Sequence, residues 1–149
     1  MPWFQGSHEE TFTVPTSLEV TKRHFADPAT IVANTEHVAS HTIDDGLVHF
    51  VLELQDHGVV QFKGDYKCRY ALEGDVLRWT AEGGNTEQAG EARFTATDAG
   101  TEVAYRETVK VDLDVGKMMA PMLKPVMGPM IGHEIKDFVK RMVKALPSA

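Results

Sequence analysis

Apolar and polar side chains alternate along the middle of the chain, between residues 37 and 112. Such alternation is typical of strands that bury one face. The longest run extends over residues 60–72, where apolar residues or glycine occupy every second position. The pattern predicts six strands, at residues 37–43, 47–54, 60–72, 76–81, 91–97 and 101–112. Because most of the turns between them are short, we expect an antiparallel meander with one apolar face.

The N-terminal part predicts one further strand and two short helices. Residues 10–14 alternate as a strand would, and a proline follows them. Thr16 and Glu19 have the spacing of a capping box, in which the Thr16 hydroxyl and the Glu19 carboxylate close the start of a helix that ends near Ala26. Asp27 and Pro28 then predict the start of a second helix, which ends near residue 34.

The last third of the chain is predicted to be helical. Ile131, Ile135, Phe138 and Met142 recur at helical spacing, and a proline at 147 ends the stripe. The preceding segment, 117–131, is rich in methionine, and its three prolines would each remove a backbone hydrogen bond from a regular helix. Three interpretations of this segment stay open: a kinked helix start packed in the core, a deformable lid, or a surface that contacts a membrane or a partner protein.

This order of elements predicts one α+β domain over residues 1–149. The order is β-α-α-β-β-β-β-β-β-α, with a curved, antiparallel, seven-stranded sheet around a long C-terminal helix. Two short helices cannot cover the apolar face of such a sheet, so the long helix must cover most of it. Aromatic side chains on a curved face leave gaps, and we therefore expect a cavity between sheet and helix. The length and the 42% hydrophobic content agree with one globular unit.

The same order of elements resembles the START-like superfamily, also called SRPBCC or helix-grip, which includes polyketide cyclases and plant pathogenesis-related allergens. Within it the chain resembles small bacterial proteins similar to the G subunit of carbon monoxide dehydrogenase. The resemblance extends over nearly the whole chain and rests on residues 60–66, 90–94 and 100–105 and on the final helix. Residues 34–36 depart from it, because many such relatives carry a Pro-Gly turn there. It implies the helix-grip fold.

Charge and cysteine content exclude several function classes. The net charge of −7 and the absence of a basic patch argue against nucleic acid as a partner. A single cysteine, Cys68, permits no intrachain disulfide, which favours a cytoplasmic location. The N-terminus has no signal-peptide pattern, and no stretch reaches the roughly 18 apolar residues that a membrane span needs.

No residue pattern indicates a metal, a cofactor or a nucleophile. His37 and His41 would lie about 13 Å apart on one strand face, too far to share an ion. His133 begins a zincin-like pattern without the second histidine, so we expect all seven histidines to be exposed or hydrogen-bonded. Cys68 falls on the apolar side of its strand and is expected to act as a small hydrophobic side chain. Motifs of serine hydrolases and of nucleotide-binding loops are absent.

Alternation places the charged residue Glu107 on an apolar strand face, beside Tyr105 and Val109. Three explanations stay open. The side chain emerges at a strand end or bulge, pairs structurally with a buried Arg or Tyr, or lines the cavity as a polar anchor or general acid/base. Burial of this carboxyl would raise its pKa.

We therefore predict binding or transport of a hydrophobic small molecule or lipid, with no catalytic residue assigned. One alternative is a polyketide cyclase- or hydrolase-like enzyme, which would need several polar groups converging in the cavity. The other is an accessory protein that docks on a larger complex or a membrane through residues 117–131. The predicted cavity residues are Phe50, Phe62, Tyr66, Tyr70, Trp79, Phe94, Tyr105, Glu107, Met119, Met122 and Met130.

Overall fold

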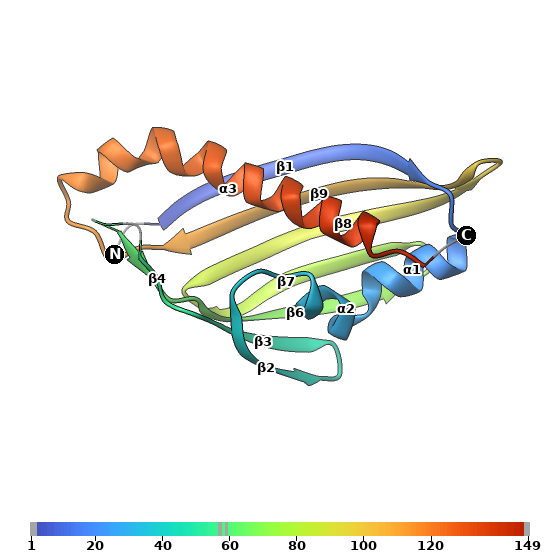
Figure 1. Cartoon of the computed structure of the whole chain (residues 1–149), viewed down its shortest axis with the longest axis horizontal. Coiled ribbons are helices and arrows are strands. Elements are labelled where there is room, and N and C mark those ends of the chain that lie inside the picture. Colours follow the sequence, from blue (N-terminus) through green and yellow to red (C-terminus); the bar gives the residue numbers. More distant parts are fainter. Residues whose placement is uncertain (1–2, 57, 59, 148–149) are drawn as a thin grey trace.

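The computed structural model describes residues 3–56, 58 and 60–147. Its main sheet is antiparallel and seven-stranded, in the order β1-β9-β8-β7-β6-β3-β2, and curves along its length (Figure 1). The strands are β1 (Trp3–Val14), β2 (Val38–Asp44), β3 (Leu47–Leu52), β6 (Asp65–Glu73), β7 (Val76–Gly84), β8 (Thr86–Thr97) and β9 (Gly100–Asp112). Two short strands, β4 (Gln55–Asp56) and β5 (Gln61–Phe62), pair separately. The predicted fold class is confirmed.

Three helices lie on the concave face of the sheet. The long helix α3 (Met119–Lys144) crosses this face, and its main contacts are with β1 (Figure 1). The short helices α1 (Leu18–Ala26) and α2 (Pro28–Ala33) lie near the C-terminal end of α3. In the part of the chain that the structure describes, no helix combines the length and hydrophobicity that a membrane span requires.

Glycine allows α3 to approach β1 closely. A Cβ atom at Gly6 of β1 would lie 2.5 Å from the Cβ of Ile131 and 2.6 Å from the carbonyl oxygen of Gly128. At Gly132, a Cβ would lie 2.8 Å from the backbone oxygen of Ser7. The strand β1 begins at residue 3, whereas the sequence pattern predicts a strand only from residue 10. The pattern misses the first residues because part of their inward face is glycine backbone, which leaves no full apolar alternation.

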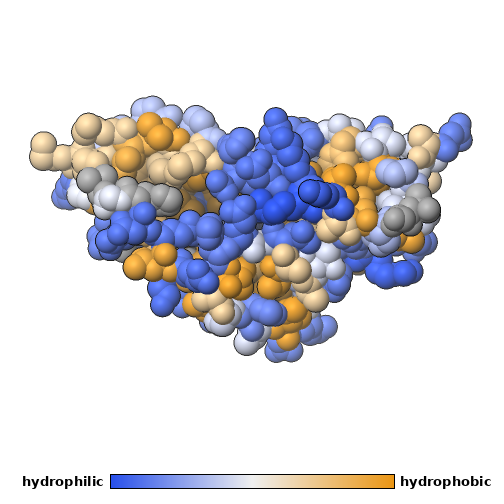
Figure 2. Space-filling view, in the orientation of Figure 1, coloured by the Kyte–Doolittle hydropathy of each residue, from blue (hydrophilic) through white to orange (hydrophobic). Residues whose placement is uncertain are grey.

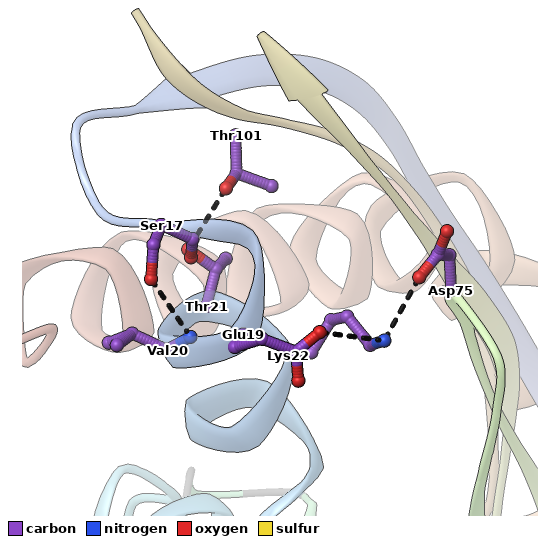
Figure 3. Close-up of polar contacts among 7 residues, drawn as sticks. All are labelled: Ser17, Glu19, Val20, Thr21, Lys22, Asp75 and Thr101. Atoms are coloured by element: carbon purple, nitrogen blue, oxygen red, sulfur yellow. Dashed lines mark hydrogen bonds and ion pairs between the residues drawn. The ribbon is translucent and has the colours of Figure 1, made fainter.

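The predicted capping box at the start of α1 is wrong by one residue. Ser17, not Thr16, is the N-cap, and its hydroxyl accepts a hydrogen bond from the backbone N–H of Val20 at 3.3 Å (Figure 3). Thr16 is buried instead. The Glu19 carboxylate lies 3.6 Å from Lys22 Nζ, with which it forms an ion pair on the helix surface (Figure 3).

Two strand predictions also need correction. The single strand predicted over 60–72 is interrupted at residues 63 and 64, between β5 and β6, and at Gly64 a Cβ would lie 2.7 Å from the Leu52 side chain. The loop predicted between residues 83 and 90 is mostly strand, because β7 continues to Gly84 and β8 begins at Thr86. The consequence is that residues 86–90 belong to the sheet and contribute to its concave face.

Candidate ligand-binding site

A cavity of about 350 Å³ lies between the concave face of the sheet and the helices. Its walls come from β6, β7, β8 and β9, from the second half of α3 and from residues near α2. Most of the lining side chains are apolar or aromatic. The aromatic members are Phe25, Phe62, Tyr66, Tyr70, Trp79, Tyr105 and Phe138.

Glu107 lies in the wall of this cavity and is only 8% exposed. Tyr105 donates its hydroxyl hydrogen to Glu107 Oε1 at 2.9 Å, and the Trp79 indole N–H donates to Glu107 Oε2, also at 2.9 Å. Burial raises the pKa of Glu107 to about 7, and these two hydrogen bonds limit the rise because they favour the carboxylate. The carboxyl group is therefore half-ionised near neutral pH.

The pairing of three strands explains how Trp79 reaches Glu107. Trp79 of β7 is paired with Gly90 of β8, and Gly90 is paired with Glu107 of β9. A Cβ at Gly90 would lie 2.8 Å from the Trp79 ring and 2.9 Å from the Cα of Glu107. Gly90 thus leaves open the space through which the indole extends across β8 to the carboxylate.

A second polar group lies beside the first. The amide of Gln88 lies between two tyrosines: its Nε2 donates to the hydroxyl of Tyr66, and the hydroxyl of Tyr70 donates to its Oε1, both at 3.4 Å. These hydrogen bonds are long and therefore weak. Burial raises the pKa of both phenols, so they stay protonated at neutral pH. Gln88 fell in the predicted loop, and the sequence prediction missed it.

The cavity lining also includes exposed and half-buried ionisable residues. Arg141 of α3 donates to the Glu36 carboxylate at 2.9 Å and to the backbone oxygen of Asn34 at 2.8 Å. These contacts tie the segment after α2 to the long helix. His37, in a left-handed backbone conformation (φ 65°), and Glu134 are exposed and also belong to the lining.

No family model matches the sequence, and no curated protein matches it either. Solved structures do match. Zhui, an aromatase/cyclase from Streptomyces sp. R1128, has a TM-score of 0.65 and 13% identity over 94% of this chain and 92% of its own. The protein TTHA0849 of Thermus thermophilus has a TM-score of 0.65 and 14% identity over 96% and 95%. The chain has the helix-grip fold.

A third similar structure is a norcoclaurine synthase from Thalictrum, with a TM-score of 0.57 and 12% identity over 97% of both chains. Similarities at this level of identity show the helix-grip fold alone. The finer resemblance to the G subunit of carbon monoxide dehydrogenase stays a prediction.

Seven of the eleven residues predicted to line the cavity do line it, and the other four lie elsewhere. Phe50 is buried under the lining, where its ring stacks on Tyr66 at 4.9 Å between centroids. Phe94 is buried against Phe25, at 5.8 Å. Met119 and Met122 belong to the start of α3, outside the lining. The seven that line it are Phe62, Tyr66, Tyr70, Trp79, Tyr105, Glu107 and Met130.

Of the three explanations for Glu107, the strand end or bulge is wrong, and a role as polar anchor or general acid/base stays a prediction. The residue lies within β9, in regular pairing with both neighbouring strands. It combines the other two explanations, because it is hydrogen-bonded by a buried tyrosine and also lines the cavity. The Trp79 indole, which the sequence prediction did not consider as a partner, donates the second hydrogen bond.

Of the remaining candidate groups, Cys68 lies beside this polar cluster, where its thiol donates to the backbone oxygen of Gln88 at 3.7 Å. Burial raises the pKa of Cys68 to about 12, so its thiol stays protonated and unreactive at neutral pH. Across the described residues, no three His, Cys, Asp or Glu side chains are grouped as a metal site. His24 bonds to the backbone oxygen of Met142 at 2.7 Å, whereas His41 is exposed. His57 lies outside the described residues.

Residues 119–131 of the segment 117–131 form the first half of α3, with Pro125 and Pro129 inside the helix, and Met118 is the N-cap. Met127 is buried, but four other apolar residues at every fourth position are exposed. The exposed fractions are 88% for Met118, 69% for Met122, 58% for Val126 and 44% for Met130. In Figure 2, apolar surface gathers at the upper left, where Figure 1 places the start of α3. Packing in the core therefore describes only part of this segment.

Proposed function

We propose that the protein binds a hydrophobic small molecule or lipid in the cavity between the sheet and α3. The observation that carries this proposal is the cavity of about 350 Å³ with apolar walls around a small polar cluster. Small-molecule sites of proteins typically measure ~300–1,000 Å³ and combine apolar walls with a few oriented polar groups. Glu107, Gln88 and the tyrosine hydroxyls supply such groups.

The similar structures support a small-molecule function. Zhui is named as an aromatase/cyclase, and the norcoclaurine synthase was solved with a transition-state analogue. An enzymatic function of the cyclase or hydrolase type is the alternative, and the pKa of Glu107 near 7 favours it because general acids and bases work best near the ambient pH. Binding is preferred here because the two groups that contact the Glu107 carboxyl group, the Trp79 indole and the Tyr105 hydroxyl, supply no second acid or base at neutral pH: the indole does not titrate, and burial holds the pKa of Tyr105 well above its ordinary value.

Native mass spectrometry of protein purified from its own host tests the binding function. We expect an adduct that denaturation releases as an apolar molecule. The variant Val109→Phe would fill part of the cavity and remove the adduct, whereas Thr95→Phe, at an exposed position of β8, would keep it. A thermal melt checks that both variants are folded. A natively purified protein without any adduct, which also binds no apolar probe, would contradict the proposal.

The same adduct separates binding from catalysis. A carrier returns the released molecule unchanged after incubation with the protein, whereas an enzyme converts it to a product of different mass or absorption. Loss of that conversion in Glu107→Gln, at unchanged affinity, would support the enzymatic alternative.

A second candidate function is contact with an anionic membrane surface through residues 117–131. The exposed apolar side chains at 118, 122, 126 and 130 form one stripe of α3. Lys117 and Lys124 accompany the stripe, and no acidic residue occurs from 115 to 133, although the whole chain carries −7. Apolar side chains beside cations are typical of helices that lie at a lipid interface.

Co-sedimentation with vesicles tests this candidate. We expect binding to vesicles that contain phosphatidylglycerol and loss of binding in Met122→Asp. The matched control is Ile43→Asp, which places the same charge at another exposed apolar residue, 41% exposed on β2. Equal binding of both variants, or no binding of the natural sequence, would contradict membrane contact through this stripe.

A further inference from the structure

The ionisable groups around the cavity are mainly acidic. Three carboxyl groups line it, those of Glu36, Glu107 and Glu134, against one guanidinium, that of Arg141, and one imidazole, that of His37, which lies 3.3 Å from the Glu36 carboxylate. Arg141 is already paired with Glu36 at 2.9 Å, so its charge is not available to an incoming anion without breaking that contact. No lysine lines the cavity in the described part of the chain.

Glu107 has hydrogen-bonding capacity that the protein does not use. A carboxylate offers about four lone-pair positions, and the protein fills one on each oxygen, from Trp79 and Tyr105. Because the group is buried, its ionised form is poorly solvated and lacks a charged partner. A donor on a bound molecule would supply the missing interaction, and charge-assisted hydrogen bonds are stronger than neutral ones.

We propose that the cavity selects apolar molecules that carry a hydrogen-bond donor, a hydroxyl or a protonated amine, bound to Glu107, and discriminates against molecules that carry a carboxylate. This inference rests on the proposed binding function and adds the chemical class of the ligand. Fatty acids and other apolar anions are disfavoured because their charge would enter a poorly solvated space beside Glu107. An apolar molecule with a hydroxyl or an amine meets a free acceptor there instead.

Three probes of similar size and different chemistry test the ligand class: 2-naphthol, 2-methoxynaphthalene and 2-naphthoate. Their dissociation constants are measured at pH 8 by calorimetry, and the indole N–H resonance of Trp79 reports binding at this site. A Trp3→Phe variant assigns that resonance, because the chain has two tryptophans. We expect 2-naphthol to bind about tenfold more tightly than 2-methoxynaphthalene, although the methoxy compound is more hydrophobic, and 2-naphthoate to bind most weakly.

The variant Glu107→Gln keeps the shape of the side chain and removes its charge. It should reduce the advantage of 2-naphthol several-fold and improve the binding of 2-naphthoate. Glu102→Gln, an exposed position on the opposite face of β9, is the matched control and should leave all three constants unchanged.

The outcomes separate this inference from the proposed function. Equal binding of the three probes to the natural sequence, or tightest binding of 2-naphthoate, would overturn the ligand class and leave the binding function standing. If no probe binds and the purified protein carries no adduct, the binding function fails and the inference fails with it. The comparison of probes on the natural sequence holds whether or not a variant folds.

Discussion

Replacing Glu107 with glutamine should change how the stability of the protein depends on pH. The glutamine amide can take the place of the protonated carboxyl group: its oxygen accepts from the Trp79 indole, and its N–H donates to the Tyr105 hydroxyl oxygen. Those two partners lie 2.9 Å from the carboxylate oxygens in the natural protein. The variant therefore keeps the local contacts and loses only the titration.

The direction of this pH dependence follows from the pKa of Glu107 in the folded and in the unfolded chain. Burial raises the pKa of Glu107 from 4.5 to about 7 in the folded protein. Below pH 4.5 the group is protonated in both the folded and the unfolded chain. Between pH 4.5 and 7 the folded chain keeps its proton while the unfolded chain releases it, so the free energy of unfolding falls as the pH rises. Above pH 7 both are ionised and the loss is complete.

The size of the stability difference between the natural protein and Glu107→Gln follows from the same two pKa values. A pKa difference of about 2.5, at ~1.4 kcal/mol for each pKa unit, corresponds to about 3 kcal/mol. The natural protein should therefore be less stable than Glu107→Gln by up to about 3 kcal/mol at pH 8. The two should have similar stability at pH 4.

Urea unfolding at a series of pH values from 4 to 8 measures this difference, because other carboxyl groups titrate equally in both proteins and cancel. Glu102→Gln, which removes one exposed charge from the same strand, should show no such trend. A difference between the natural protein and Glu107→Gln that stays constant from pH 4 to pH 8 would refute the argument that Glu107 is buried with a raised pKa.

Three further substitutions test the packing that positions the cavity. Gly90→Val should destabilise the protein by about 1–3 kcal/mol, or prevent folding, and should shift the Trp79 indole N–H resonance, because a Cβ there would lie 2.8 Å from that ring. Gly6→Ala should cost a similar amount in thermal unfolding, since its methyl group would meet α3 at 2.5 Å, whereas Gly116→Ala meets nothing within 4 Å and should be neutral. Ser17→Ala removes the N-cap of α1 and should cost about 1 kcal/mol in urea unfolding.

The alternating pattern was sufficient to predict the sheet and the inward face of its best-marked strands. A period of two fixes which side chains share a face whatever the neighbouring strands are. Tyr66, Trp79, Tyr105 and Glu107 therefore point inward as predicted. The same pattern carries no information on register. Trp79 and Glu107 are 28 residues apart, and only the pairing of both with Gly90 brings their side chains into contact.

The predictions failed where packing did not depend on apolar side chains. The first half of β1 packs on α3 partly through glycine backbone, so its sequence lacks the alternation of a buried strand. Thr16 and Ser17 are adjacent and chemically alike as caps, and only tertiary burial of the Thr16 side chain decides between them. For β1 the deciding contact is with α3, far along the chain, whereas the Thr16 hydroxyl is held inside by the hydroxyl of Thr21 at 2.7 Å.

The start of β8 shows the same effect at the site itself. Thr86, Gln88 and Gly90 are the inward positions of residues 86–90, and none is a large apolar residue, so no apolar alternation marks this strand after the loop signal of Gly83, Gly84 and Asn85. A strand that faces a packed core needs apolar inward residues, whereas one that faces a cavity with polar groups does not. Glu107, on the next strand, breaks the alternation at the position paired with Gly90. The inward residues at the start of β8 and Glu107 of β9 thus lie on adjacent strands, and together they form the polar part of the cavity wall.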